Sequence, residues 1–180
     1  MFLEKLEVGI YRVNCYVIAD KNSMSAAVID PGADFENIRD IIEDTKTTVD
    51  YLQSRVSKQV VFDFSAPQHP VFVALNPALH SWTIENLVKN AIDAMKGKGN
   101  LTIKISELED VVKIKITDSG KGIPKNQFSK VFEPGFTTKK RGWGLGLSLT
   151  KRIVQEYHKG RIKVAHSEIG KGTTMQMSFK

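Results

Sequence analysis

The chain has a single cysteine, Cys15, and no apolar run that reaches the roughly 18 residues needed to cross a bilayer. One cysteine cannot form an internal disulfide, so a disulfide-stapled secreted scaffold is excluded and a reducing compartment is favoured. The first residues, MFLEKLEVG, carry acidic side chains and lack the apolar core of a signal peptide. We therefore expect a cytoplasmic chain that makes no membrane contact of its own.

Aromatic residues are scarce, at 8%, and the lysines and arginines are scattered rather than clustered with them. The net charge of +6 therefore does not indicate a nucleic-acid partner, and a phosphate-handling site would also need positive charge. Hydrophobic residues make up 41% and charged residues 26%, the composition of a globular protein. A length of 180 residues fits one ordinary domain with an appendage.

Apolar periodicity divides the chain into three parts. Short apolar runs in residues 1–34 predict a small β meander, and apolar steps of three and four over 35–56 predict a linking helix. In residues 57–180 we expect strands at VVFDFSA, VFVALN, LTIKIS, VVKIKIT, RIKVAHS and TTMQMSFK, and helices near 77–95, 125–132 and 146–157. This order predicts an α+β fold, a two-layer α/β sandwich whose mixed sheet has helices on one face.

The helix expected at 77–95 carries Asn86, Lys89, Asn90 and Asp93 at spacings that make them neighbours on one face. A solvated face is the ordinary explanation for such a pattern. Asparagine is a poor helix former, however, and a merely solvated face would usually carry Glu, Lys or Gln. The amide oxygen of Asn90 suits magnesium, which takes few protein ligands and completes its shell with phosphate and water.

A first glycine-rich loop, ITDSGKGIP, begins where a strand is expected to end. Asp118 lies at the mouth of that strand, and Gly120 and Gly122 allow the backbone to approach a ligand closely. Taken alone, the loop is an ordinary turn.

A second glycine-rich stretch, TTKKRGWGLGL, places Gly142, Gly144 and Gly146 directly before a helix. Backbone N–H groups and a helix N-terminus at this point suit phosphate oxygens. The pattern is neither the dinucleotide fingerprint, because Leu149 stands three positions after Gly146, nor a Walker A loop. The cationic TTKKR segment is either a mobile surface loop or a lid that closes on nucleotide.

The order of these elements is more specific than any one of them. ENLVKNAIDAM, DSGKGIP, VFEPGFTTK, GWGLGL and GKGTTM resemble, in turn, the N, G1, F, G2 and last glycine boxes of the GHKL (Bergerat-fold) ATPases. The resemblance covers about residues 57–180 and is nearest to the ATP-binding catalytic domain of bacterial sensor histidine kinases. It implies ATP and Mg²⁺ as cofactors, a Bergerat fold and transfer of the γ-phosphate to a histidine.

The resemblance also implies a role for each matching residue. Asn90 would hold Mg²⁺, and Asp118 would accept a hydrogen bond from the adenine amine, supported by Thr173 or Thr174. The residues implied in catalysis are Asn86, Lys89, Lys139 and Arg141. Those implied in nucleotide binding are Asn86, Asn90, Asp93, Asp118, Gly120, Gly122, Ile123, Phe132, Thr138, Lys139, Gly142, Gly144, Leu145, Gly146, Leu147 and Thr173.

Four positions depart from the pattern or extend it. Gyrase-type relatives have a glutamate general base where this chain has Asn86, which puts fast water activation in doubt and suits a kinase that avoids hydrolysis. Phe132 and Phe136 would anchor the lid. Trp143 stands where the family often has a smaller residue, as a lid plug or as packing.

No phosphoacceptor motif is present, because none of the four histidines is followed by the acidic residue and proline that the kinases carry. The resemblance therefore implies a catalytic domain that is inactive alone, with the acceptor histidine on a separate hairpin domain and a response regulator downstream. Two alternatives are a stand-alone serine kinase of the anti-sigma-factor type and a non-catalytic nucleotide-binding or dimerisation module.

Residues 1–34 resemble the opening strands of metallo-β-lactamase-fold hydrolases, but the metal-binding H-x-H-x-D-H motif of that family is absent. We therefore expect no hydrolase activity and regard the segment as a fusion, a chimera or a chance match. Residues 1–56 are also a candidate surface for homo-oligomer formation.

Overall fold

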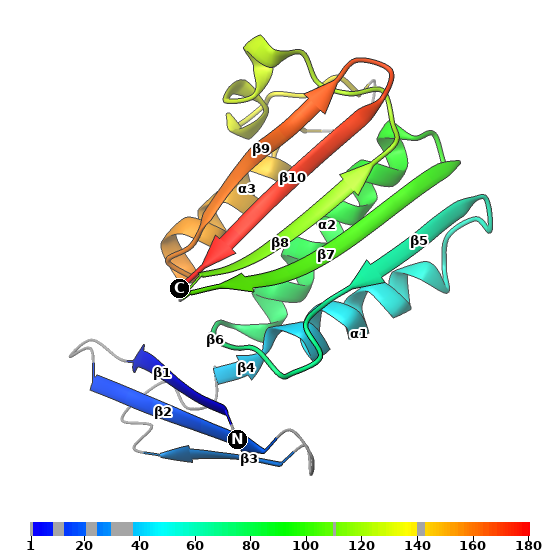
Figure 1. Ribbon diagram of the computed structural model, residues 1–180. Coiled ribbons are helices and arrows are strands. Elements are labelled where there is room, and N and C mark those ends of the chain that lie inside the picture. Colours follow the sequence, from blue (N-terminus) through cyan, green and yellow to red (C-terminus); the bar gives the residue numbers. More distant parts are fainter. Residues whose placement is uncertain (1, 9–12, 21–24, 30–37, 110, 140–142) are drawn as a thin grey trace.

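The computed structural model describes residues 2–8, 13–20, 25–29, 38–109, 111–139 and 143–180. These residues form a two-layer sandwich and two smaller sheets, of three and of two strands (Figure 1). The main sheet has five strands in the order β5-β7-β8-β10-β9. They are β5 (Val60–Ser65), β7 (Gly99–Leu108), β8 (Val111–Asp118), β9 (Arg161–Glu168) and β10 (Gly172–Phe179).

Strand β5 pairs with β7 in parallel, and the other pairings of this sheet are antiparallel, so the sheet is mixed. The helices lie behind the sheet in Figure 1 and leave its other face open. They are α1 (Ile41–Gln53), α2 (Pro77–Ala94) and α3 (Gly146–Arg152). The predicted two-layer sandwich with helices on one face is confirmed.

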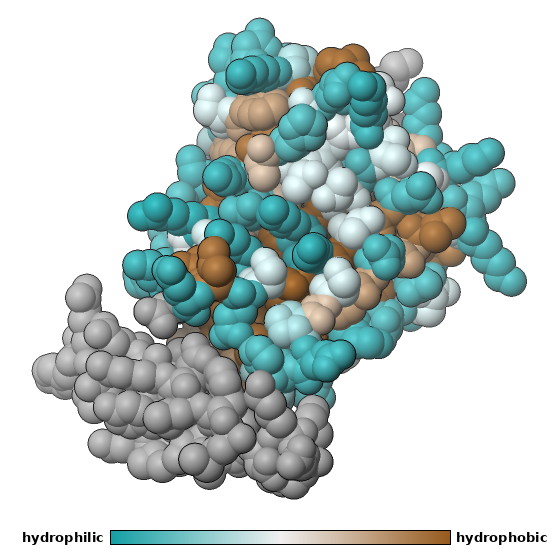
Figure 2. Space-filling model, in the orientation of Figure 1, coloured by the Kyte–Doolittle hydropathy of each residue, from teal (hydrophilic) through white to brown (hydrophobic). Residues whose placement is uncertain are grey.

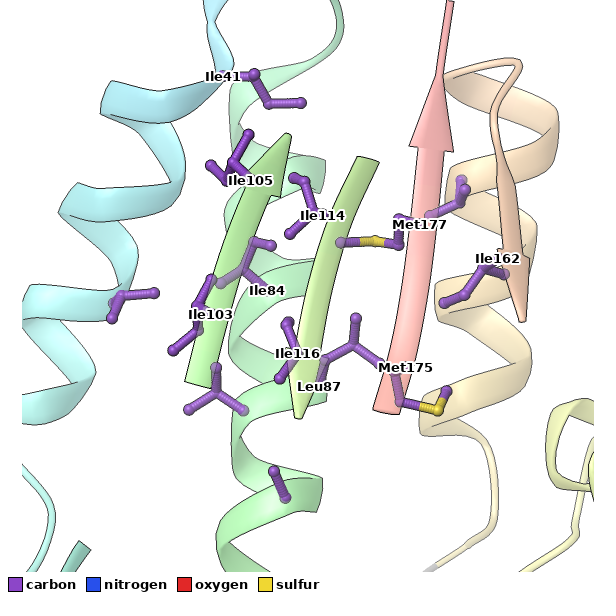
Figure 3. Close-up of a cluster of buried hydrophobic side chains, with 14 of the residues drawn as sticks. Ile41, Ile84, Leu87, Ile103, Ile105, Ile114, Ile116, Ile162, Met175 and Met177 are labelled. Atoms are coloured by element: carbon purple, nitrogen blue, oxygen red, sulfur yellow. The ribbon is translucent and has the colours of Figure 1, made fainter. Parts of the chain in front are cut away.

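The hydrophobic core lies between the two layers. Alternate residues of β7 and β8 are buried, as expected when one face of a strand packs and the other meets solvent. Figure 3 shows Ile84 and Leu87 of α2 among Ile103, Ile116 and Met175 of the sheet. Because both layers share one core, the position of α2 over the sheet is fixed by packing.

The first helix begins later than predicted, because Ile38–Asp40 are extended and form β4, which pairs with β6 (Phe72–Ala74). The side chain of Asp40 accepts the N–H of Ile42 at 3.0 Å and caps α1. The predicted VFVALN strand therefore belongs to this two-stranded sheet rather than to the main one.

Helix α1 packs against α2 and shares the core of the sandwich. The Thr45 hydroxyl lies 2.9 Å from Nε2 of His80, and both residues are fully buried. Nε2 of His158 accepts the N–H of Asn76 at 3.2 Å, and the rings of His80 and His158 are 6.5 Å apart between centroids. Both rings lie against Phe179, so α1, α2 and the end of β10 meet at one buried polar cluster.

Two other elements differ from their predicted form. The helix expected at 125–132 is a pair of 3-10 turns, η2 (Lys125–Gln127) and η3 (Lys130–Phe132), because Pro134 follows and prevents a longer helix. The helix expected at 146–157 ends as α3 and continues as the π-helical turn η4 (Ile153–Tyr157), whose bond from His158 N–H to Ile153 C=O measures 3.0 Å.

At the amino-terminal end, β1 (Phe2–Val8), β2 (Val13–Asp20) and β3 (Ser25–Ile29) form the predicted antiparallel meander. Figure 1 shows it beyond one end of the sandwich, where β1 lies near β6. Across the described part of the chain, no helix is both long and apolar enough to span a bilayer.

Candidate functional site

A cavity of about 670 Å³ opens between α2, the ends of β8 and β10, and the segment before α3. This volume lies in the range of small-molecule sites, roughly 300–1,000 Å³. Most of the residues singled out from the sequence line it: Asn86, Asn90, Asp93, Asp118, Gly122, Ile123, Thr138, Lys139, Gly144, Leu145, Gly146, Leu147 and Thr173. Phe136 and Trp143, the candidate lid residues, line it as well.

Other predicted residues lie elsewhere. Lys89 forms an ion pair with Glu85, one turn back on α2, and is not among the lining residues. Phe132 is buried in the hydrophobic core, with the ammonium of Lys151 6.0 Å from its ring centroid. Arg141 and Gly142 fall outside the described residues.

Asp118 occupies the last position of β8 at the base of the cavity and is only 7% exposed. Burial raises the pKa of its carboxyl group, and backbone N–H groups of Gly120 and Thr173 oppose this shift by bonding to the carboxylate. The Gly120 amide donates to Oδ1 at 2.8 Å. A carboxylate accepts about four hydrogen bonds, so acceptor capacity remains for a ligand.

The conformation of the loop after Asp118 depends on Gly122. Its φ of +74° is a left-handed conformation, and an added Cβ would lie 2.2 Å from the carbonyl oxygen of Glu168. Next to it, the N–H of Ile123 donates to the Ser167 hydroxyl at 2.7 Å. The loop is thereby held against the hairpin of β9 and β10.

Of the two threonines considered for the adenine contact, Thr173 lines the cavity and Thr174 does not. Thr173 is 5% exposed, and its hydroxyl lies 2.9 Å from that of Ser167. The Thr174 hydroxyl lies on the other face of the sheet, 3.0 Å from that of Thr117. Strand alternation therefore separates the two.

On the opposite wall, Asn86 is held by α3. Its Nδ2 donates to the Thr150 hydroxyl at 2.8 Å, and Thr150 is fully buried. Gly146 allows this approach, because an added Cβ would lie 2.6 Å from Oδ1 of Asn86. The first turn of α3 and the middle of α2 are thus in contact beside the cavity.

Gly146→Ala should shift Asn86 away from Thr150 and destabilise the domain. Overpacking of this kind costs about 1–3 kcal/mol, and we expect the lower part of this range because the obstructing atom belongs to a side chain. Thermal unfolding of the variant should show a lower midpoint than the wild type. Gln155→Ala, at an exposed position of η4, is the control and should change the midpoint little.

At the outer end of the cavity, the ammonium group of Lys139 lies among side-chain oxygen atoms of α2. Nζ of Lys139 donates to Oδ1 of Asn90 at 2.9 Å and to Oδ2 of Asp93 at 2.6 Å. Nearby, Nζ of Lys121 donates to the Thr138 hydroxyl at 2.7 Å. The segment before α3 is thereby joined to α2 and to the loop after β8 through polar contacts.

Sequence reasoning did not single out Thr150, Ser167, Lys121, Ile116 or Met175. Ile116 and Met175 form apolar lining, and Lys121 is a second cation beside the cavity. Thr150 lies one turn after Gly146, a spacing that was readable from the sequence. Ser167 depends on the register of β9 against β10, which the sequence does not specify.

Residues 79–180 match the family described as "Histidine kinase-, DNA gyrase B-, and HSP90-like ATPase", and this match covers more than half of the chain. The chain belongs to this family. The domain of this family binds ATP, and we refer to the sandwich below as the ATPase domain. The prediction of a GHKL-type ATP-binding domain is confirmed.

Relatives and solved structures place the ATPase domain beside sensor histidine kinases. It is 38% identical over 125 residues to sensor histidine kinase ZraS of Escherichia coli (strain K12). The aligned region makes up 69% of this chain but only 26% of ZraS. The catalytic domain of histidine kinase ThkA has a TM-score of 0.71 and 26% identity, covering 79% of this chain and 93% of that one. The structure of ThkA in complex with response regulator protein TrrA has a TM-score of 0.68 and 24% identity, and the match covers 79% of this chain and 40% of that one. The chain thus contains a catalytic domain of the sensor histidine kinase type.

Proposed function

We propose that the ATPase domain binds ATP with Mg²⁺ in its cavity and donates the γ-phosphate to a histidine on a separate hairpin domain. The observation that carries this proposal is one cavity with a buried carboxylate, Asp118, at its base and a cationic, oxygen-rich end at its mouth. The two ends of a nucleotide match the two ends of this cavity: the adenine ring offers a hydrogen-bond donor, and the phosphates carry negative charge. Phosphoryl transfer depends mainly on positioning and on charge stabilisation.

Adenine recognition is assigned to the base of the cavity. Asp118 would accept the exocyclic amine, and the buried Thr173 hydroxyl lies on the neighbouring strand at the paired position. Ile116 and Met175 supply apolar surface for the ring. A carboxylate acceptor favours adenine over guanine, which carries a carbonyl oxygen at the corresponding position.

The phosphates are assigned to the other end of the cavity, next to Lys139 and the backbone N–H groups around Gly144 and Gly146. The residues present there also fit Mg²⁺, because Oδ1 of Asn90 and Oδ2 of Asp93 already surround the ammonium of Lys139. Asn90 would hold the ion. When bound, the ion would neutralise charge on the phosphate oxygens.

Asn86 would favour transfer to an acceptor over hydrolysis. It lies beside the same cavity, and its amide donates to Thr150, so it offers no carboxylate base toward a water molecule. Phe136 and Trp143 line the same cavity. The catalytic roles proposed for Lys89 and Arg141 rest on the sequence alone.

A transfer assay tests the proposal. The chain is incubated with γ-labelled ATP, Mg²⁺ and a separately produced helical hairpin that carries a phosphoacceptor histidine. Acid-labile label on the hairpin supports the proposal. Acid-stable label on a serine of a partner protein would indicate the serine-kinase alternative, and ATP binding with no transfer to either would indicate a non-catalytic module.

Asn90→Ala should lower ATP affinity about tenfold in the presence of Mg²⁺ and much less in EDTA. The loss of one oxygen ligand to the ion removes a contact worth roughly 1–2 kcal/mol. Calorimetric titration with and without Mg²⁺ measures both affinities. Asn126→Ala, at an exposed position of η2, is the matched control and should leave both unchanged. An equal loss with and without Mg²⁺ would contradict the role given to Asn90.

We propose that residues 38–180 form one folding unit, which extends the unit expected at 57–180 to include α1. The support is burial: Ile41, Val49 and Leu52 of α1 lie in the core cluster shared with the sheet. Deletion of residues 1–34 should therefore keep ATP affinity within about twofold, because every proposed ligand lies outside them. A folded deletion variant that no longer binds ATP would show that this segment shapes the site.

The remaining partners follow from the kinase proposal. ThkA was solved with a response regulator, and we propose a partner of this kind downstream of the acceptor hairpin. Because the chain spans 26% of the length of ZraS, these partners concern a larger assembly than the domain itself. A cytoplasmic location and self-association through residues 1–56 stay predictions.

A further inference from the structure

The open face of the main sheet carries a concentration of positive charge. Side chains on alternate positions of β7, β8, β9 and β10 point away from the helices, and Figure 2 shows this side as teal and white over much of its area, with separate brown patches. Five cations lie on it: Lys104, Lys113, Lys115, Arg161 and Lys163. We call these five residues the cationic face. The sheet separates them from the nucleotide cavity.

Strand register arranges the cationic face in two rows. In the first, Lys104 pairs directly with Lys115, Lys115 with Gln176, and Gln176 with Lys163. In the second, Ser106, Lys113, Ser178 and Arg161 follow one another across the same four strands. Directly opposed residues lie about 4.5–5.5 Å apart, and the rows are two residues apart along the strands. All five charges therefore fall within one compact area.

This arrangement is unfavourable for the isolated domain. Lys104 and Lys115 are like charges directly opposite each other, which destabilises a strand pair. The two rows contain no acidic side chain; Asp63 of the edge strand β5 pairs with Thr102, outside the rows, and leaves the five cations in excess on this face. None of the five cations forms an ion pair with a residue that the structure describes. A solvated face would usually mix charges of both signs. A ligand of opposite charge would remove the repulsion.

We propose that the cationic face binds an acidic surface of a folded protein partner. The face is a sheet with serine and glutamine side chains between the cations, so it offers hydrogen-bond donors to carboxylates over a broad area. The rows contain no aromatic residue, whereas single-stranded nucleic acid is bound by stacking on aromatic side chains. The face has no helix to enter a major groove. Its exposed apolar side chains, Val61 and Leu108, lie outside the rows at opposite ends of β7 and form no continuous surface to enter a lipid interface.

The test measures binding of fluorescently labelled poly-L-glutamate to the full chain at low salt. A variant with Lys104→Gln, Lys115→Gln and Lys163→Gln should bind about tenfold more weakly than the wild type. The control variant carries Lys58→Gln, Lys98→Gln and Lys130→Gln, three exposed lysines off this face, and has the same net charge. It should stay within about twofold of the wild type.

Two further measurements complete the test. The unfolding midpoint of the face variant should be equal to or higher than that of the wild type, because a like-charge pair has been removed, so weaker binding cannot come from unfolding. Amide chemical shifts should move along β7, β8, β9 and β10 on titration. Equal weakening in both variants would overturn the proposal. So would tighter binding of duplex DNA or of phosphatidylserine vesicles through the same three lysines.

Discussion

Asp118→Asn should weaken ATP binding by roughly 100-fold or more while leaving the ATPase domain folded. The substitution keeps the size of the side chain and removes its negative charge. Oδ1 of Asp118 accepts the Gly120 amide at 2.8 Å, and an asparagine oxygen can keep this bond. The other terminal atom then becomes an NH₂ donor, which would face the amino group of adenine. Two donors in a buried site leave both groups unsatisfied.

The fold should tolerate this change because the charge is costly where it lies. Burial raises the pKa of Asp118, so the ionised form is disfavoured in the empty site. Replacement by a neutral amide removes this cost but weakens the bonds from the backbone N–H groups of Gly120 and Thr173, so the unfolding midpoint at neutral pH should change little. A loss of ATP affinity without a loss of stability would separate recognition from structure.

Asp63→Asn is the matched control. Asp63 lies exposed on β5, away from the cavity, and its substitution makes the same change in charge and size. Calorimetric titration with ATP and with GTP should show wild-type binding for this control and a reduced preference for ATP in Asp118→Asn. If Asp118→Asn bound ATP with unchanged affinity, the assignment of adenine to the base of the cavity would be wrong.

The sequence predicted the lining of the cavity better than its internal contacts. Glycines and short polar motifs mark where backbone approaches a ligand, so Gly122, Gly144 and Asn90 were recognisable from pattern alone. The partners of these residues come from distant segments. Lys139 reaches Asn90 and Asp93 across 49 and 46 residues of sequence, and Asn86 reaches Thr150 across 64. Such contacts depend on tertiary packing.

Lys89 shows the limit of reasoning from a helix face. Its spacing from Asn86 makes it a neighbour on α2, yet its long side chain pairs with Glu85 and lies off the cavity. The periodicity of a helix fixes where the Cβ atom points but not where a flexible ammonium goes. Short asparagine side chains have less freedom, and both predicted asparagines line the cavity.

The boundary between β4 and α1, where the folding unit begins, was the feature that the sequence predicted least well. The apolar steps from Ile38 onward fit a helix, but Ile38–Asp40 are extended because β6 offers a pairing partner and Asp40 caps the helix that follows. The pairing of β4 with β6 spans the whole of α1 and β5, so no local signal specifies it. Packing of α1 on α2 then brings the Thr45 hydroxyl to within 2.9 Å of Nε2 of His80, a contact between residues 35 positions apart.

The ATPase domain should lose about 3 kcal/mol of stability as the pH falls from 7 to 4, through His80. Burial, followed by the charge of His158, lowers the pKa of this fully buried imidazole from 6.5 to about 4, with Asp44 acting in the opposite direction. Between pH 6.5 and 4, His80 is protonated in the unfolded chain but stays neutral in the folded chain. Stability is therefore complete above about pH 6.5, and the loss is complete below about pH 4.

Three elements hold His80 in this neutral form: Thr45 of α1 bonds to Nε2, Phe179 of β10 covers the ring, and His158 after η4 lies beside it. Burial also lowers the pKa of His158, so it contributes in the same direction. Urea unfolding at pH 7, 6, 5 and 4.5 measures the effect. His80→Gln, which keeps a polar group for Thr45, should be less stable at pH 7 but should lose less stability on acidification. His166→Gln, at an exposed position of β9, should follow the wild type at every pH. Parallel losses in the wild type and in His80→Gln would show that carboxyl groups, and not the buried imidazole, control the acid response.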